Sequence, residues 1–369
     1  MKIEEIAKNL EEFRDQGVVS MLPTHFKEEE YRDYDALSQS FLKRQDKSIQ
    51  EIFKEVDQSS PHIRMGNIVD DMLSLAVKDF YNKYMVSKAE KPTEKLKLFI
   101  DQVVNITNNE HTSTIFDLDE ETAYKVCTRS SHDVDYGKKM KAGTLYSKIE
   151  TFSDYIEELY KANDKISITQ QEYENALSMA KNMISSKFTK HYFYTKAEAL
   201  AENKLIVYQL PVFFMYNKVH CKALLDMVII QFNDQGNIDW IQPVDFKTTS
   251  RPLLETVPSV LYFRYDIQAF FYTQALTNLT EWQDNIYIRP FKFIFCETFG
   301  PDFNCDVLEV TSSVMKHAEH GNQRNLKGIS ELMNYYKFYQ KEGYEVEFDR
   351  FRENYDEPLK INIENGFIV

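Results

Sequence analysis

The spacing of apolar residues divides the chain into two parts. Up to about residue 200 the apolar positions recur at helical spacing, as they do over residues 3–13 and again over residues 68–80, and this spacing predicts amphipathic helices. Thr169 and Glu172 have the spacing of a capping box, which marks the start of a further helix. We therefore predict helices over residues 1–86 and a helical insertion over residues 87–200.

The second part is rich in β-branched and aromatic residues, and this composition predicts strands. The first three strands are expected at Leu205–Tyr216, Cys221–Phe232 and Ile238–Thr248. The short polar links between them favour antiparallel hairpins. A helix, two strands and terminal helices should follow at Tyr265–Leu279, Phe291–Cys296, Asp306–Val310 and Ser312–Glu342. The chain is thus expected to have an α+β (α/β) fold, with a mixed central sheet flanked by helices and an inserted helical region.

Composition narrows the class of protein. With 369 residues, 43% of them hydrophobic, the chain can bury one large core or two smaller ones. Its sequence has no apolar run long enough to span a membrane and begins with an acidic amphipathic pattern rather than a signal peptide. We therefore expect a cytoplasmic protein, in the host cytoplasm if a phage encodes it, with no membrane partner.

The cysteines and histidines give little indication of a metal site built from sulfur or imidazole. The four cysteines are widely spaced and have no CxxC or Cys/His pattern, which predicts reduced and mostly buried thiols: Cys127, Cys221, Cys296 and Cys305. His317 and His320 lie one helical turn apart, but the sequence shows no third ligand. This pair therefore favours a solvated helix face over a zinc site.

The formal net charge of −14 speaks against a nucleic-acid partner, because phosphate binding normally uses clustered Lys and Arg. Net charge averages over the whole surface, however, so a local basic channel beside an acidic site is compatible with it. Two stretches could form such a channel: residues 138–148, and residues 181–196, where lysines alternate with aromatic side chains. Each stretch could equally be an ordinary solvated helix face.

The candidate chemistry lies on two neighbouring predicted strands. Asp226 interrupts a nearly continuous apolar strand, and an ionised carboxylate there is costly unless it is paired or bound to a cation. On the next strand Asp245 and Lys247 project from one face, roughly 6–7 Å apart, while Phe246 points the other way. Two carboxylates and the backbone carbonyl of Phe246 suffice to hold Mg²⁺, which prefers oxygen ligands. The alternative is a buried Asp–Lys ion pair with a structural role only.

Several segments in order resemble the RecB-like branch of the PD-(D/E)xK nucleases. Ala36–Lys43 is similar to the "S-x-S-x-L-K" helix start, and Met65–Asp70 to the "G-T-x-x-H" helix. Cys221–Asp226 and Val244–Thr248 match "C-K-x-x-x-D" and "x-D-x-K-T". Gln268 and Tyr272 match the Q-x-x-x-Y motif, whose two residues share one face of a helix.

Within that branch the chain is most similar to the RecE-type phage exonucleases (exonuclease VIII). The resemblance implies a restriction-endonuclease-like core and Mg²⁺-dependent 5′→3′ digestion of linear double-stranded DNA, with Mn²⁺ as a substitute. It also implies a homo-oligomer that works with a single-strand annealing protein in DNA recombination. No iron–sulfur cluster is expected, because the cysteines that hold one in related nucleases have no counterparts here.

The resemblance also assigns residues. The catalytic set would be Lys247, Asp226, Asp245, Gln268 and Tyr272, and the metal ligands would be Asp70, Asp226, Asp245 and the carbonyl of Phe246. Residues 1–86 would carry the first motif, residues 201–342 the remaining motifs, and residues 343–369 a C-terminal extension.

Two positions depart from the family pattern. Asp70 replaces the first-motif histidine, and Asp71 competes for that role because the helix register is uncertain by one residue. Gln209 stands where the family has an acidic residue on the first strand and is a secondary candidate. These departures leave two alternatives open: a same-fold endonuclease, and a catalytically degenerate DNA-binding or scaffolding protein.

Overall fold

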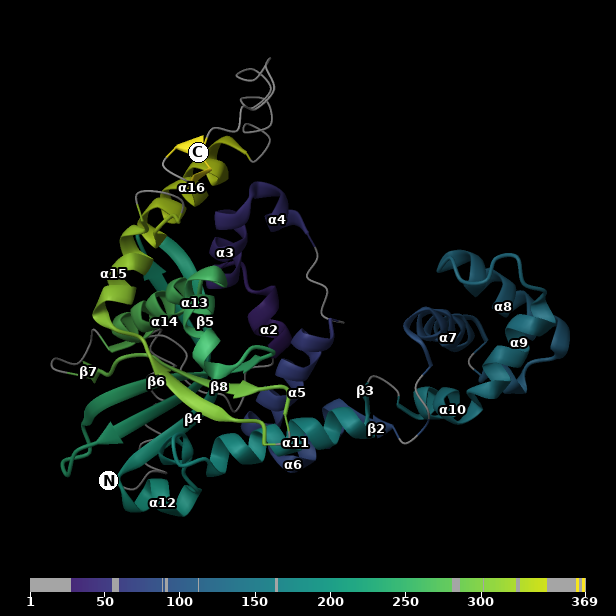
Figure 1. Cartoon of the computed structure of the whole chain (residues 1–369), viewed down its shortest axis with the longest axis horizontal. Coiled ribbons are helices and arrows are strands. Elements are labelled where there is room, and N and C mark those ends of the chain that lie inside the picture. The colour runs from purple at the N-terminus through teal and green to yellow at the C-terminus, as the bar shows by residue number, and fades with distance from the viewer. Residues whose placement is uncertain are drawn as a thin grey trace. The chain divides into compact units, whose positions relative to one another are not determined.

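The computed structural model describes residues 28–54, 60–87, 89, 92–111, 113–162, 165–280, 286–300, 302–322, 326–343, 363–364 and 367–368 (Figure 1). Its contacts divide the chain into unit 1, residues 1–58 and 183–369, and unit 2, residues 59–182. The helical insertion predicted over residues 87–200 overlaps unit 2 but begins and ends later. The amphipathic start at residues 3–13 and most of the predicted C-terminal extension lie outside the described residues.

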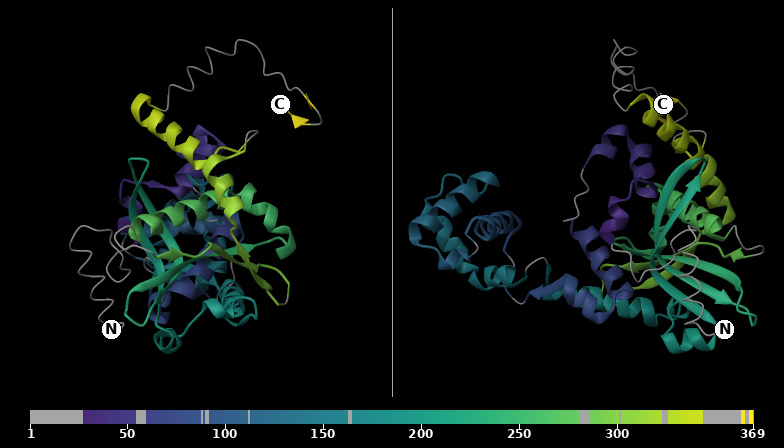
Figure 2. Two further views of the ribbon diagram at one scale, coloured as in Figure 1. Left: turned by 90° about the vertical axis from the view of Figure 1, so that its left-hand side faces the viewer. Right: turned by 180° about the vertical axis from the view of Figure 1, so that it is seen from behind.

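Unit 1 contains a mixed sheet that curls along its strands (Figure 2). Strands β4 (Lys204–Tyr216), β5 (Val219–Phe232) and β6 (Ile238–Thr249) form two successive antiparallel hairpins, which confirms the three predicted strands and their connections. β8 (Lys292–Glu297) runs parallel to β6, and β9 (Cys305–Glu309) runs antiparallel to β8. The short strands β1 (Leu37–Ser38) and β7 (Tyr287–Ile288) lie parallel to β5 and β6.

One helix, α14 (Tyr265–Thr280), organises the core of unit 1. It packs against β4 and β5 with buried residues on nearly every side, as expected for a helix that is apolar all round. The helices α3 (Gln39–Lys47) and α15 (Ser312–His320) flank it, and α16 (Ile329–Glu342) packs on both of these (Figure 1). The remaining helices of unit 1 are short: α2 (Glu28–Asp33), α4 (Ile49–Phe53), α12 (Lys196–Ala201) and α13 (Val257–Tyr262).

The side-chain alternation of β4 and β5 reverses at one level of the sheet. On β5 the positions that face the main core are odd-numbered up to Leu225 and even-numbered from Val228 onward. On β4 the same reversal falls between Val207 and Leu210. Between these two residues Gln209 has φ 49°, a left-handed conformation that is rare for a non-glycine residue within a strand. The strand pair is therefore kinked at the level of Gln209 and Asp226.

Unit 2 has its own apolar core, built by α7 (Glu94–Ile106), α8 (Glu120–Asp133), α9 (Ala142–Thr151) and α10 (Ser153–Ala162). It also contains α5 (Pro61–Ser74), α6 (Val77–Lys83) and the start of α11 (Gln170–Ser185). The predicted capping box is confirmed, because Thr169 N donates to Glu172 Oε2 at 2.7 Å and Glu172 N donates to Thr169 Oγ1 at 3.1 Å.

The prediction of helix alone over this region was wrong in one respect. β2 (Tyr84–Ser87) and β3 (Ile166–Thr169) form a parallel pair. Each strand is too short to show a period, and its partner lies far away in the sequence, so local spacing carried no signal for the pair.

Two further observations concern the thiols and the helices. All four cysteines are buried and free of disulfide bonds. Across the described residues, each helix falls short of the length or the apolar character needed to cross a membrane.

Candidate active site

The candidate site lies where β5 changes its partner. The ladder between β5 and β6 ends at the pair Met227–Val244, and further along the same edge β1 pairs with β5 at Leu37–Cys221. The next residues outward from the last β5–β6 pair are Asp226 and Asp245. Beyond this fork the backbone of β6 is free of β5, and Phe246 N donates instead to Asp226 Oδ2 at 2.9 Å. The fork thus brings the two predicted carboxylates to neighbouring positions.

Asp245 is held from two sides. Its side chain is about 1% exposed, and it forms an ion pair with Lys247, as the alternation along β6 predicts. From α14, Gln268 Nε2 donates to Asp245 Oδ1 at 2.5 Å. A carboxylate this deeply buried needs such partners, because an unpaired charge in this environment would be very costly.

Lys247 is a partly exposed cation that lies beside both carboxylates. Burial lowers its pKa, but the charges of Asp245 and Asp226 outweigh burial, so that its pKa lies above the ordinary value of 10.5 and the ammonium form is retained. Its side chain is 19% exposed, and its Nζ also donates to the carbonyl of Phe246 at 3.3 Å. Phe246 itself points to the opposite face of the sheet, where it stacks on Phe193 with ring centroids 5.8 Å apart.

The structure adds a second lysine to this site. Lys43 of α3 places its Nζ 5.2 Å from the ring centroid of Tyr265, and Lys247 places its own Nζ 5.3 Å from the same centroid. Burial, followed by the positive charge of Lys247, lowers the pKa of Lys43 to about 7, although Asp245 partly offsets this. Lys43 closes the "S-x-S-x-L-K" segment in the sequence, but nothing in the spacing indicated that it would approach the candidate site.

The Q-x-x-x-Y pair lies beside the carboxylates. Gln268 contacts Asp245 directly, rather than the lysine, phosphate or base that its position on the helix suggested. Tyr272 is buried, and its pKa lies well above the ordinary value because of burial first and then the nearby charges of Tyr31, Asp245 and Asp226. Tyr272 is therefore a neutral phenol at physiological pH.

Two other motif residues have structural roles. Lys222 is buried, and its Nζ donates to the carbonyls of Tyr31, Arg32 and Tyr34 at 2.8, 2.8 and 2.7 Å. A lysine at the end of α2 satisfies carbonyls that have no partner within the helix. Ser38 is the N-cap of α3, with its hydroxyl accepting from Phe41 N at 3.4 Å.

The first-motif candidates belong to unit 2. Asp71 is buried and committed to contacts inside that unit, since Tyr84 Oη donates to its Oδ2 at 2.5 Å and Lys83 Nζ lies 2.8 Å from the same oxygen. Asp70, its neighbour on α5, is half-buried. Asp70 stays the proposed ligand on the sequence resemblance alone.

The solvated helix face predicted for the two histidines is correct for His320 but wrong for His317, which a buried carboxylate of a neighbouring helix holds. His317 Nδ1 lies 3.1 Å from Asp266 Oδ2, and Arg264 bridges the same carboxylate to Asp46. This buried network joins α3, α14 and α15. His320 is exposed beside Glu319.

The donor set at the fork fits a hard cation. Among the described residues, no group of three or more His, Cys, Asp or Glu side chains is placed to hold a metal ion. The fork does offer two carboxylates and the carbonyl of Phe246, which are the oxygen donors that Mg²⁺ takes, and Mg²⁺ commonly keeps several waters. Binding at Asp245 would require Lys247 to yield one carboxylate oxygen.

Comparison with known proteins gives little beyond this geometry. The chain matches no family model and no curated protein. Among solved structures it is similar to a protein from Eubacterium rectale that has been provisionally named an exonuclease, with 11% identity, a TM-score of 0.30, and coverage of 76% of this chain and 97% of the other. A likeness this slight does not establish a shared fold.

Proposed function

We propose that this chain is a Mg²⁺-dependent deoxyribonuclease with a PD-(D/E)xK core. The observation that carries the proposal is the fork between β5 and β6, where Asp226, Asp245 and Lys247 come together with Gln268 at the end of a strand ladder. The sequence resemblance supports a narrower form of it, a 5′→3′ exonuclease that acts on linear double-stranded DNA.

Asp226, Asp245 and the Phe246 carbonyl would hold the metal, with Mn²⁺ as a substitute, and Asp70 is a further ligand proposed on the resemblance alone. Mg²⁺ bound there would supply Lewis-acid polarisation of the phosphate and acidify a bound water. No other cofactor is proposed.

The residues of the chain divide the remaining work. The ammonium of Lys247 is kept charged by its neighbours and can stabilise the negative charge that develops on the phosphate. Gln268 fixes the orientation of Asp245, and the N–H of Phe246 fixes that of Asp226. Tyr272 and Lys43 complete the wall of the site, the first as a neutral phenol and the second as an amine whose lowered pKa of about 7 lets it gain or lose a proton near physiological pH.

A purely structural ion pair explains less of the geometry. A structural pair needs only Asp245 and Lys247, yet Asp226 adds another carboxylate beside them, which raises the electrostatic cost of the cluster. The kink at Gln209, with its unfavourable φ of 49°, lies at the same level of the sheet as Asp226. Backbone strain concentrated beside clustered charges is typical of functional sites rather than of packing.

The test uses a linear DNA duplex labelled at its 5′ or 3′ end. With Mg²⁺ the protein should release nucleotides, and chelation of the metal or the Asp245→Ala substitution should abolish release. Asp239→Ala is the matched control, because Asp239 is exposed on the same strand β6. Activity in Asp245→Ala equal to that of the control would refute the proposal.

Other substrates separate the alternatives. Cleavage of covalently closed circles would identify a same-fold endonuclease. Duplex binding without any cleavage in Mg²⁺ or Mn²⁺ would identify a degenerate DNA-binding protein. The proposed homo-oligomer and the annealing-protein partner rest on the resemblance alone, and sedimentation with and without DNA tests the first of them.

A further inference from the structure

A second polar cavity lies on the other face of the same sheet. Trp240 and Gln242 of β6 line it, and along a strand they point away from the face that carries Asp245. The cavity has a volume of about 400 Å³, which is within the range of small-ligand sites. It is formed entirely by unit 1, from β4, β5, β6, the β7–β8 segment, β9 and residues 191–194.

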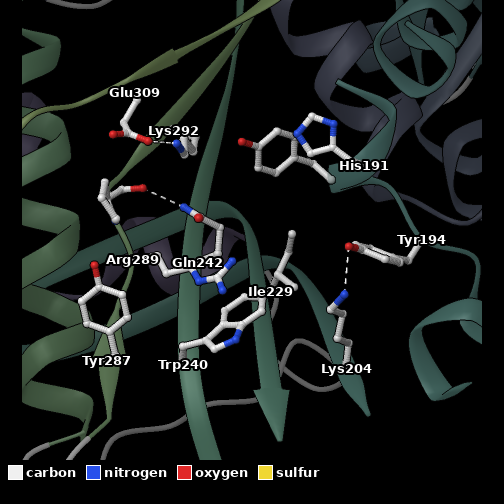
Figure 3. A pocket seen from close by; sticks show the side chains of 12 residues that line it. His191, Tyr194, Lys204, Ile229, Trp240, Gln242, Tyr287, Arg289, Lys292 and Glu309 are labelled. Atoms are coloured by element: carbon white, nitrogen blue, oxygen red, sulfur yellow. Dashed lines mark hydrogen bonds and ion pairs between the residues drawn. The ribbon is translucent and has the colours of Figure 1, made fainter. Parts of the chain in front are cut away.

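One wall is a flat cation on an aromatic ring. The guanidinium carbon of Arg289 lies 3.6 Å from the ring centroid of Trp240, and Tyr287 stands beside them (Figure 3). Within the described residues, no carboxylate forms an ion pair with Arg289. The guanidinium of Arg289 therefore lies on the indole of Trp240 with its positive charge not neutralised by an ion pair. Nucleobases stack on the plane of a guanidinium.

Two further cations and a phenol line the rest of the cavity. Lys204 donates to Tyr194 Oη at 3.0 Å and pairs with Glu202, while Lys292 pairs with Glu309 (Figure 3). Glu202 and Glu309 balance the two lysines, so the charge of Arg289 leaves the cavity net positive in a protein whose net charge is −14.

The neighbouring His191 contributes no positive charge. Burial, followed by Lys292 and Lys190, lowers the pKa of His191, so its ring is neutral at physiological pH and can serve as a hydrogen-bonding group. His191 and the two tyrosines Tyr192 and Tyr194 belong to the stretch 181–196, in which the sequence alternates basic and aromatic residues.

We propose that this cavity binds a nucleotide unit, with the base stacked against Arg289 and Trp240 and the phosphate among Arg289, Lys204 and Lys292. Aromatic planes combined with positive charge are the features that bind single nucleotides and unpaired strands without sequence preference. The ligand could be a free nucleoside monophosphate or one residue of a single strand, since both offer the same base and phosphate. The inference does not depend on hydrolysis at the fork.

Tryptophan fluorescence tests the proposal directly. The chain has two tryptophans, Trp240 and Trp282, so Trp282→Phe leaves Trp240 as the single reporter. Metal-free protein with the additional Asp245→Ala substitution is titrated with dAMP, with a short oligothymidylate and with inorganic phosphate. We expect a saturable change in Trp240 fluorescence with dAMP or with the oligomer. Saturation by dAMP would identify a free nucleotide as ligand, and a response to the oligomer alone would identify a strand.

Variants then locate the site. Arg289→Met should weaken binding by about tenfold or more, the scale of losing one stacked base. Tyr287→Ala, at a side chain that is 59% exposed and so safe for folding, should weaken it severalfold. Lys316→Met, which removes one exposed positive charge from α15 outside the cavity, should leave affinity unchanged.

Three results would overturn the proposal. They are no response to either nucleotide ligand, an equal response to inorganic phosphate alone, or equal affinity in Arg289→Met, Tyr287→Ala and Lys316→Met. Because the titrations use metal-free protein with Asp245 replaced, each result is independent of whether the fork hydrolyses DNA.

Discussion

The ion pair between Asp245 and Lys247 offers a quantitative test of the candidate site in the absence of metal. Asp245→Asn keeps the shape of the side chain and leaves an oxygen for Gln268 to contact, while it removes the charge opposite Lys247. Lys247→Met keeps most of the aliphatic stem and leaves Asp245, which is about 1% exposed, without its counter-ion. Each single substitution therefore leaves one buried charge without its closest counter-ion.

The magnitudes follow from burial. Removing one partner of a buried pair costs about 3–5 kcal/mol, because the other charge remains in a poorly solvated place. We expect a loss of unfolding free energy at the lower end of this range for Asp245→Asn, because Lys247 is 19% exposed and still has Asp226 nearby. For Lys247→Met we expect a loss at the upper end, because Asp245 is about 1% exposed. The double variant buries neither charge, so its unfolding free energy should lie within about 1–2 kcal/mol of the parent protein.

Urea unfolding of all four proteins, with chelator present, completes a double-mutant cycle. The coupling free energy should be at least about 2 kcal/mol, with the double variant more stable than Lys247→Met. Additive losses would mean that the two charges do not share one buried environment, and the arrangement at the fork would then be wrong. In the presence of Mg²⁺, both single variants and the double variant should fail to cleave DNA, whatever their stability.

Three further predictions concern other motif residues. Lys222→Met removes three charge-assisted hydrogen bonds to backbone carbonyls, and urea unfolding should show a loss of about 2–3 kcal/mol in unfolding free energy. The control Lys218→Met, at an exposed turn, should change the unfolding free energy by less than about 0.5 kcal/mol. The pKa of Lys43 is lowered from 10.5 to about 7, so between these pH values the unfolded chain binds more protons than the folded chain. The unfolding free energy should therefore rise with pH across this window. Lys43→Met should flatten the rise in unfolding curves measured at several pH values. Asp71→Asn should destabilise unit 2 by about 1–3 kcal/mol, because it removes the charge that pairs with Lys83 and accepts from Tyr84. Asp70→Asn should reduce Mg²⁺-dependent DNA cleavage more than it lowers the melting temperature. If Asp71→Asn instead had the larger effect on cleavage at unchanged stability, Asp71 would be the ligand.

Much of unit 1 could be predicted because its signals are local. The strands β4, β5 and β6 are long segments of β-branched and aromatic residues joined by short turns, so their type and pairing followed from composition and loop length. The alternation along β6 likewise predicted that Asp245 and Lys247 would share a face and that Phe246 would not.

Other features depend on contacts between distant parts of the sequence. Lys43 approaches Lys247 because α3 packs on α14. The residue pattern within either segment could not predict this contact. The parallel pair β2–β3 joins residues about eighty positions apart, and neither strand is long enough to show a period. The cavity around Trp240 and Arg289 combines six separate segments, of which only residues 181–196 had a noticeable pattern.

The position of Asp226 shows how local pattern and tertiary structure combine. A regular strand with period two would have placed Asp226 and Val228 on one face, so a carboxylate within this apolar run looked like an isolated exception. In the folded chain the side-chain alternation of β5 reverses at Asp226, and the alternation of β4 reverses at Gln209 on the same level of the sheet. The two strands therefore stay in register through the kink. Because the β5–β6 ladder ends at the next residue, the kink also leaves the N–H of Phe246 free to bind the Asp226 carboxylate. Replacing Gln209 with glycine would relieve the positive φ without removing the kink, so it should preserve or raise stability, whereas a β-branched valine should favour a regular strand and move Asp226 away from Asp245.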